Sequence, residues 1–400
     1  MPIKPQAKIP VSWEQVAAFR LSRHHLSARA PLPDLVSVVS DMAGAQAQLL
    51  SAAQISLWPR VSTLQIDDVE AAISERHLVK AGCMRRTLFL VPAEELAIFV
   101  RGTARRAEKG IRWTLGKGVP ERTVTAAIAA TLEALDHPLT RAEIAERVSR
   151  LLGVPMQAIQ GGGWGSRRKV AAVPVGELTF PVVDLLHLAA ARGVVCYGPN
   201  RGNEPTFVRA DAWLSRWQDV PQAEAERLLW RKYLRAFGPA TVADFALWSG
   251  MTLTEARHVW AREQADLATV EVEGWAATVL QADVDALLQT KFERPLVRLL
   301  PYFDAFLLGH KERDHLVDEA RRPDVYRPQG WIAPVVLVNG RIAAVWKQVQ
   351  AKNQLQVAVT PFGSLSARVI DRIYEEAQDL GRFLGVPGVD VQIGETGVLS

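Results

Sequence analysis

Apolar residues recur along the chain at helical spacing and are followed by short β-prone runs. In the first region, residues 1–100, helical spacing begins at Trp13. This region closes with HLVKAGCMRRTLFLV (77–91), in which an apolar run of strand character follows basic residues. The pattern predicts a unit made of helices that ends in strands.

The same plan recurs in residues 101–215. Within HPLTRAEIAERVSRLLG (137–153), Thr140 and Glu143 have the spacing of a capping box before an amphipathic helix. The glycine-rich GGGWGS (161–166), which no strand pattern precedes, is expected to be a loop leading into the N-terminus of the next helix. VVCYGPNRGNEPTFVRA (194–210) then predicts two short strands around a turn. Three helices followed by a hairpin is the element order of a winged helix.

A third region, residues 216–290, repeats the order. YLRAFGPATVADFALWSGMTLTEARHVW (233–260) predicts two short helices joined by Gly250, and the apolar strand WAATVL (275–280) follows. The predicted fold class is therefore mainly α with β wings (α+β), built from three tandem winged-helix motifs.

The pattern changes in residues 291–400, where we expect a β-rich region. RPLVRLLPYFDAFLLG (294–309) and PVVLVNGRIAAVWK (334–347) have strand character, and Asn339-Gly340 is a strong signal for a two-residue hairpin turn. The last amphipathic helix, LSARVIDRIYEEAQDLGRFLG (365–385), is expected to pack back on the body of the protein.

The segment DMAGAQAQLLSAAQ (41–54) places three glutamines in an otherwise apolar stretch. On a helix, Gln46 and Gln48 would point about 200° apart, whereas on an extended link they point the same way. Gly44 precedes the pair and favours the end of a helix. We therefore predict a short non-helical joint between two helices. Its amides either satisfy backbone groups there or face a polar ligand.

Composition and motifs exclude several classes of protein. The 400 residues are 48% hydrophobic and 22% charged, which is typical of a soluble globular protein of several domains. Cys83 and Cys196 provide neither a disulfide framework nor a metal set, which suits the cytoplasm. No signal peptide, membrane span, G-x-S-x-G, H-E-x-x-H, P-loop or dinucleotide motif is present. We expect no metal, no cofactor and no membrane partner.

The net charge is +4, and basic residues concentrate in RGTARRAEKGIRWTLGKGVPER (101–122). Arg101, Arg105, Lys109 and Arg112 would share one face of a continuous helix. Such a stripe is either a solvated helix surface or a face that follows phosphates.

An ordered set of motifs indicates a family. With GAQAQ (44–48), MRRTLFLV (84–91), FGPATVADF (237–245), PYFDAFLLGHKERD (301–314) and VVLVNGRIAAVWK (335–347) in this order, the chain resembles the AlkZ/YcaQ group of bacterial DNA glycosylases. The resemblance runs from about residue 12 to the end. It implies winged helices around a DNA-binding cleft and the removal of bulky N-alkylated purines, with unhooking of interstrand crosslinks.

The resemblance also implies catalytic residues. Members carry a glutamine–aliphatic–glutamine or glutamine–x–aspartate motif, which here is Gln46-Ala47-Gln48. The two amides would place water beside C1′ and stabilise oxocarbenium-like charge, because a cationic alkylpurine leaves without protonation. Where the group often has Arg-Gly-Thr-Leu-His, this chain has Arg85-Arg86-Thr87-Leu88-Phe89, which could change the range of substrates.

We expect a monomer that binds double-stranded DNA carrying alkylpurine lesions, in the cytoplasm and associated with the nucleoid. The residues expected to contact DNA are Arg85, Arg86, Thr87, Arg105, Lys109, Arg201 and Lys347. The alternatives are a non-catalytic winged-helix DNA-binding protein, such as a transcriptional regulator, and a homologue that binds damage without excising it. A regulator of this kind normally has one winged helix per chain, so three such units favour the enzyme.

Overall fold

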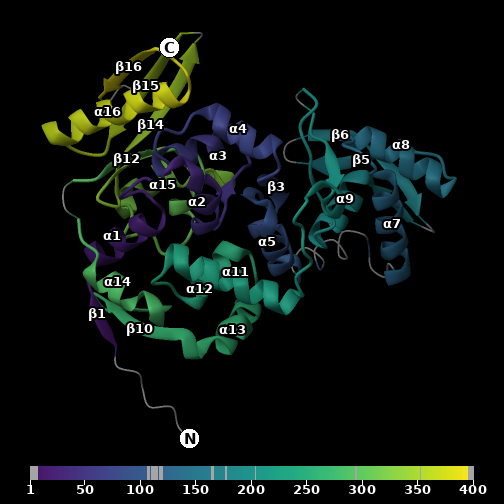
Figure 1. Cartoon of the computed structure of the whole chain (residues 1–400), viewed down its shortest axis with the longest axis horizontal. Coiled ribbons are helices and arrows are strands. Elements are labelled where there is room, and N and C mark those ends of the chain that lie inside the picture. The colour runs from purple at the N-terminus through teal and green to yellow at the C-terminus, as the bar shows by residue number, and fades with distance from the viewer. Residues whose placement is uncertain are drawn as a thin grey trace, which may run out of the picture. The chain divides into compact units, whose positions relative to one another are not determined.

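The computed structural model describes residues 8–105, 109, 116, 120–163, 166–175, 178–202, 204–292, 295–351 and 353–394 (Figure 1). This described part of the chain divides into two compact units. Unit 1 comprises Met1–Glu75, Trp230–Trp248 and Thr252–Ser400, and unit 2 comprises Arg76–Leu229 and Ser249–Met251. Unit 2 is thus an almost continuous segment inserted into unit 1. The four-region division expected from the sequence stays a prediction.

The helices within the described ranges are α1 (Trp13–Arg23), α2 (Leu35–Asp41), α3 (Leu50–Leu57), α4 (Ile66–Ser74), α5 (Leu96–Gly102), α7 (Glu121–Ala134), α8 (Arg141–Leu152), α9 (Val182–Ala191), α10 (Ala210–Trp213), α11 (Gln222–Phe237), α12 (Val242–Ser249), α13 (Leu253–Arg262), α14 (Val284–Gln289), α15 (Arg322–Val325) and α16 (Ala367–Phe383). None of them has the length and apolar character needed to span a bilayer.

The strands within the same ranges are β1 (Ile9–Val11), β2 (Ala45–Gln46), β3 (Leu78–Gly82), β4 (Leu88–Pro92), β5 (Gln157–Gly163), β6 (Ser166–Val175), β7 (Leu178–Pro181), β8 (Val195–Tyr197), β9 (Phe207–Arg209), β10 (Leu267–Val272), β11 (Trp275–Leu280), β12 (Val297–Leu300), β13 (Val335–Val338), β14 (Arg341–Ala351), β15 (Gln354–Pro361) and β16 (Gly388–Ile393).

One sheet of unit 1 joins distant parts of the sequence. Strand β1 pairs in parallel with β10, with Ile9 opposite Val270, and β10 pairs antiparallel with β11. The apolar face of this sheet packs against α1 and α14, where Phe19 and Leu287 are buried. The N-terminal strand is therefore fixed by residues that lie late in the sequence.

The second sheet of unit 1 has the order β12-β13-β14-β15-β16. Asn339 and Gly340 connect β13 to β14 with φ angles of 48° and 81°, so the hairpin predicted from these two residues is confirmed. Gly340 also lies close to α1, because an added Cβ would be only 2.9 Å from the Cβ of Ala17. Strand β16, which pairs in parallel with β15, was not predicted.

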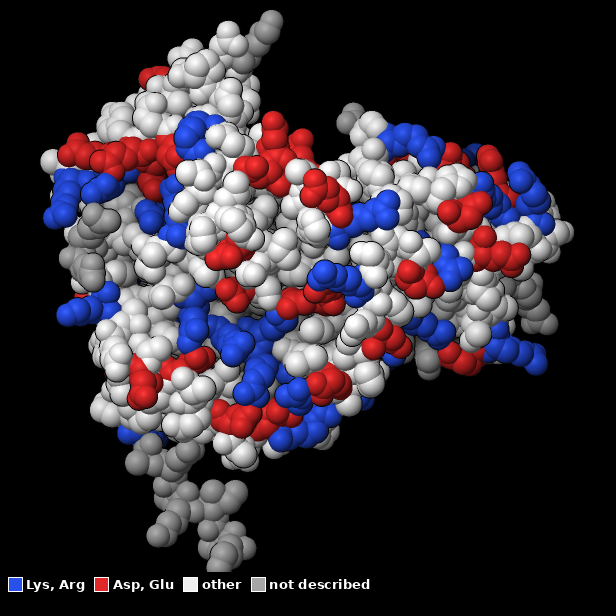
Figure 2. Space-filling view, in the orientation of Figure 1, with Lys and Arg blue, Asp and Glu red and all other residues white. Residues whose placement is uncertain are grey.

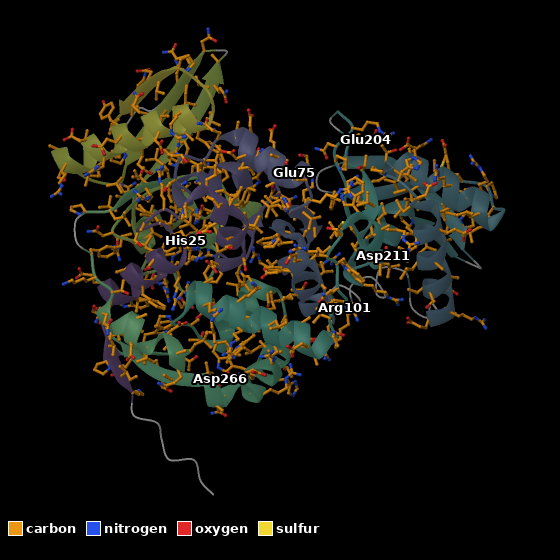
Figure 3. All side chains as sticks on the ribbon, viewed as in Figure 1. His25, Glu75, Arg101, Glu204, Asp211 and Asp266 are labelled. Carbon is orange, nitrogen blue, oxygen red and sulfur yellow. The ribbon has the colours of Figure 1, made fainter. Side chains whose placement is uncertain are left out.

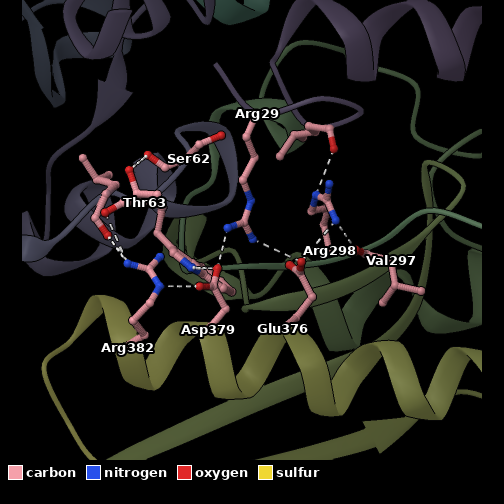
Figure 4. Close-up of polar contacts among 11 residues, drawn as sticks. Arg29, Ser62, Thr63, Val297, Arg298, Glu376, Asp379 and Arg382 are labelled. Carbon is pink, nitrogen blue, oxygen red and sulfur yellow. Dashed lines mark hydrogen bonds and ion pairs between the residues drawn. The ribbon is translucent and has the colours of Figure 1, made fainter. Parts of the chain in front are cut away.

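Helix α16 lies along this sheet and is held by a charged network (Figure 4). Arg29 donates to Glu376 over 3.2 Å and also to Asp379, while Arg298 donates to Glu376 over 3.1 Å. Burial raises the pKa of Glu376, although the two arginines oppose this effect. The expected packing of the last helix onto the body is confirmed.

In unit 1, His24 and His310 are buried and His315 is partly buried. His310 Nε2 lies 2.9 Å from the carbonyl oxygen of Phe237, and His315 Nε2 lies 3.0 Å from Arg20 Nη1. Burial lowers the pKa of all three imidazoles, aided by nearby arginines, and the pKa of His315 falls to about 2. The three rings are therefore neutral in the folded protein at pH 7.

Helices α7, α8 and α9 form the core of unit 2 with β6 and the β8–β9 hairpin. Thr140 caps α8: the Glu143 N–H donates to Thr140 Oγ1 over 3.4 Å, and the Thr140 N–H donates to Glu143 Oε2 over 2.8 Å. This capping box confirms the sequence prediction. Leu139, just before it, forms a β-bridge with Phe207.

The prediction for GGGWGS was wrong. Residues 161–163 belong to β5, which pairs antiparallel with β6, and Gly163 lies opposite Ser166. The described residues of this segment therefore belong to two paired strands inserted between α8 and α9, not to a loop into a helix. Glycine has no side chain to contribute to an apolar alternation, so the strand pattern was not visible in the sequence.

One element order occurs three times along the chain. In the third region α11 is followed by Ala240, which bridges to Thr278, and then by α12, α13, β10 and β11. In the second region the order is α7, the Leu139 bridge, α8, the inserted strands β5 to β7, α9, β8 and β9. In the first region it is α2, β2, α3, α4, β3 and β4.

Candidate functional site

The Gln46–Gln48 segment is a non-helical joint between α2 and α3, as predicted. Helix α2 ends at Asp41, and Ala43 and Gly44 then take φ angles of 56° and 88°. The Gly44 N–H still donates to the carbonyl oxygen of Val39 over 2.9 Å, which closes the helix end. Because a positive φ suits glycine, Gly44 allows the chain to turn there and enter the short strand β2.

The two amides of the joint differ in exposure. The side chain of Gln46 is buried, with 7% of its surface exposed, whereas Gln48 is exposed. Strand β2 ends at Gln46, and Gln48 lies in a bend that leads to α3. The backbone is therefore not extended from Gln46 through Gln48. For this reason it does not by itself place the two side chains on the same side, which was the expectation from the sequence.

A groove of unit 1 begins one residue after Gln48. Its volume is about 480 Å³, and it is lined by Leu49, Ser51, Ala52 and Ile55 at the start of α3, by Pro301, Tyr302 and Pro334, and by Trp346, Lys347, Gln348 and Val349 of β14. Lys347, one of the residues expected to contact DNA, is therefore part of the same surface as the joint. The groove places a cation and aromatic rings close to the Gln46–Gln48 segment.

A buried ion pair fixes α3 to the wall of this groove. Arg60 Nη1 and Nη2 donate to the two carboxylate oxygens of Asp304 over 2.9 and 2.7 Å. Ser56 Oγ on α3 donates to Asp304 Oδ2 over 2.8 Å, and the Phe306 N–H donates to Oδ1 over 3.0 Å. Both charged side chains are 0% exposed. Asp304 thus ties the C-terminal part of α3 to the segment that carries Tyr302.

In unit 2, Arg85 and Arg86 occupy the turn between β3 and β4, with φ angles of 53° and 62°. A left-handed φ is the conformation that glycine adopts readily and that other residues adopt only at a cost. The guanidinium of Arg85 lies 5.6 Å from the centre of the Phe89 ring, which is buried. Thr87 Oγ1 donates to the Met84 carbonyl oxygen over 3.0 Å.

Arg86 also lines a second cavity, of about 130 Å³, within unit 2. Its lining includes His187 and Tyr197 and two buried cysteines with free thiols, Cys83 and Cys196. The side chain of His187 keeps an exposed part, but desolvation of its imidazole lowers its pKa, and Arg141 and Arg86 lower it further. Burial raises the pKa of the Cys196 thiol to about 12, so this thiol is not a nucleophile at neutral pH.

The basic stripe of residues 101–112 is not one continuous helix. Helix α5 ends at Gly102 and is capped by Thr103, so Arg101 and Arg105 do not belong to the same regular helix. Arg105 Nε donates to Glu226 Oε1 over 2.5 Å. The side chain of Arg101 is labelled in Figure 3, and its Nε lies 3.6 Å from an oxygen of Asp219. Lys109 is described, whereas Arg112 lies outside the described residues.

Arg201 in the β8–β9 hairpin also has partners within unit 2. Its Nη1 donates to Glu143 Oε1 over 2.6 Å, and its Nη2 donates to the Pro138 carbonyl oxygen over 3.0 Å. The Thr140 N–H and the Arg201 guanidinium lower the pKa of Glu143 to about 2. Arg105 and Arg201 therefore make intramolecular contacts that a phosphate would have to compete with.

Sequence reasoning missed the basic residues of α11. Figure 2 shows basic side chains gathered in the region of α11 to α13. Helix α11 carries Arg231, Lys232 and Arg235, and Lys232 Nζ donates over 2.6 Å to Ser40 Oγ of α2, the helix that precedes the glutamine joint. The i, i+4 spacing of Arg231 and Arg235 was visible in the sequence, but the approach to α2 was not, because 192 residues separate Ser40 from Lys232.

Comparisons with known proteins agree on one family. The model of the family described as DNA glycosylase AlkZ-like matches residues 39–383. A Streptomyces sahachiroi protein named interstrand DNA cross-link repair glycosylase is 32% identical over 395 residues, which span 96% of this chain and 99% of that protein. The structure of Streptomyces sahachiroi DNA glycosylase AlkZ has a TM-score of 0.79 at 29% identity and covers 96% of this chain and 100% of that chain. The chain therefore belongs to the AlkZ-like family of DNA glycosylases.

Proposed function

We propose that this DNA glycosylase hydrolyses the N-glycosidic bond of cationic N-alkylated purines in DNA, above all N7-alkylguanine and its bulky adducts. The observation that carries the proposal is the Gln46–Gln48 joint, which leads directly into a groove lined by Lys347 and aromatic rings. The name of the Streptomyces relative concerns interstrand crosslinks. We extend the proposal to such crosslinks as further substrates.

The chemistry needs only neutral groups near the sugar. A purine alkylated at N7 or N3 is already cationic, so it leaves without protonation. The carbonyl oxygen of exposed Gln48 accepts a hydrogen bond from the attacking water. The side-chain amide of buried Gln46 is a fixed dipole that stabilises the positive charge developing on the sugar. Neutral bases are spared, because neither amide supplies a proton to a leaving base.

The repeated element order supports three tandem winged helices as the scaffold for DNA. We propose phosphate contacts from Arg85, Arg86, Thr87, Arg105, Lys109, Arg201 and Lys347, with Lys232 and Arg235 of α11 added from the structure. Arg86 and Lys347 are the foremost of these candidates, since each lines a cavity. The protein acts as a monomer in this proposal, and its affinity for DNA falls steeply with salt.

Base release from duplex DNA tests the proposal. The protein is incubated with a duplex that contains one N7-methylguanine, and abasic sites are cleaved with hot alkali. Gln46→Ala and Gln48→Ala should each lower the rate on the order of 10²-fold while duplex affinity is kept, because each removes one positioned polar group. Gln350→Ala, an exposed amide on β14, is the matched control and should leave the rate unchanged.

The double variant and an acidic substitution sharpen the test. The Gln46→Ala/Gln48→Ala variant should lose less than the sum of the two single losses, because both amides stabilise the same transition state and residues that act as a unit are not additive. Gln48→Asp recreates the glutamine–x–aspartate motif of related proteins and should stay active. Full excision by the double variant, or efficient release of uracil by the unchanged protein, would overturn the mechanism. Binding of the lesion without base release would instead support a damage-binding protein.

A further inference from the structure

The groove of unit 1 has more room than an N7-methyl group requires. Its lining includes Leu49, which is 39% exposed, Tyr302, and Val349, which is 45% exposed. Leu49 and Val349 therefore leave apolar side-chain surface exposed at one groove, where an apolar group of a ligand can cover it. The volume of about 480 Å³ is in the range of cavities that hold organic groups of drug size.

Hydrogen bonds and ring contacts hold the apolar surfaces of this groove in place. Trp346 forms a buried part of the lining, and its Nε1 donates to the Leu300 carbonyl oxygen over 2.9 Å. The ring of Tyr302 meets Trp331 edge-on at 5.8 Å, and Trp331 also packs on Phe303 at 5.1 Å. A rigid aromatic wall favours flat rings, because little side-chain freedom is lost when one binds.

We propose that this groove is a specificity subsite for an aromatic substituent on the alkylated purine. The inference rests on the proposed function, since the lesion must bind with its glycosidic bond at Gln46 and Gln48. The substituent lies between Leu49 and Tyr302, while Lys347 at the edge of the groove faces the DNA backbone. A methyl group at N7 is too small to make these contacts, so the subsite acts only on bulky lesions.

Two duplexes of one sequence test this inference, one with N7-benzylguanine and one with N7-methylguanine at the same position. The measured quantity is the ratio of kcat/KM for the benzyl lesion to that for the methyl lesion. Tyr302→Ala removes the aromatic wall, and Val349→Trp fills the groove from β14. Each should lower the ratio about tenfold, which corresponds to the loss of one aromatic contact. Tyr374→Ala, on the exposed face of α16, is the matched control and should keep the ratio.

The outcomes separate the subsite from the proposed function. If the unchanged protein releases neither base, the proposed function fails and the subsite with it. If it releases both bases and the ratio is the same in Tyr302→Ala and Val349→Trp as in the control, only the subsite is wrong. Val349 is exposed on a strand, so its variant folds and keeps the test decisive even if Tyr302→Ala is unstable.

Discussion

Replacing Asp304 with alanine would leave the Arg60 guanidinium buried without a counter-charge. The carboxylate accepts hydrogen bonds from Arg60, Ser56 and the Phe306 N–H, and neither Arg60 nor Asp304 is exposed to solvent. Removing one partner of such a pair costs about 3–5 kcal/mol. Since the free energy of unfolding of folded proteins is about 5–15 kcal/mol, this single change should remove a large part of it.

This loss of stability can be measured by urea unfolding with tryptophan fluorescence as the signal, because the chain has 12 tryptophans. For a slope near 3 kcal/mol per molar, the midpoint of Asp304→Ala should fall by about 1–2 M. Asp318→Ala is the matched control: it breaks the exposed ion pair with Arg341, which is worth at most about 1 kcal/mol. Arg60→Met combined with Asp304→Ala should recover much of the loss, because no unpaired charge remains buried. A midpoint loss below about 0.3 M for Asp304→Ala, or equal losses in the single and double variants, would refute this reasoning.

Two other perturbations test the turn in unit 2 and the buried histidines. Arg86→Gly should raise the free energy of unfolding by about 0.5–1 kcal/mol, since it relieves a left-handed φ, whereas Arg86→Ala should not. Both variants should reduce the slope of log affinity for duplex DNA against log salt by about 0.9 if Arg86 contacts a phosphate, and an unchanged slope would remove it from the DNA contacts. The buried histidines have folded pKa values below the unfolded value of about 6.5, so the unfolded chain binds more protons below that pH. Stability should therefore be greatest above pH 6.5 and fall by about 1.4 kcal/mol per pH unit for each histidine as the pH drops, and a flat urea midpoint between pH 7.5 and 5 would contradict their burial.

Local signals in the sequence predicted the features that depend on neighbouring residues. The Thr140–Glu143 capping box, the Asn339-Gly340 turn and the joint at Gly44 each follow from residues within a few positions of one another. The Gln46 and Gln48 pair could be located in the same way, but their different exposure could not. Exposure depends on which elements pack over the joint, and sequence spacing does not contain that information.

Contacts between distant residues were not predictable from pattern alone. Asp304 contacts Arg60, which is 244 positions away in the sequence. Nothing in the segment around either residue indicates that it belongs to a buried ion pair. The left-handed φ of Arg86 was not predictable for a different reason, because arginine rarely adopts this conformation. The groove beside Gln48 likewise exists only after β14 has folded next to α3.

The parallel pairing of β1 with β10 has a consequence for synthesis on the ribosome. Ile9 emerges early, but its partner Val270 is made 261 residues later. At about 5–20 residues per second, the first strand waits roughly 13–50 s for its neighbour. Unit 2 is encoded almost without interruption in Arg76–Leu229, so it can mature while the N-terminal segment is still unpaired. The glutamine joint is thus translated early, whereas the groove beside it is complete only after β14 has emerged.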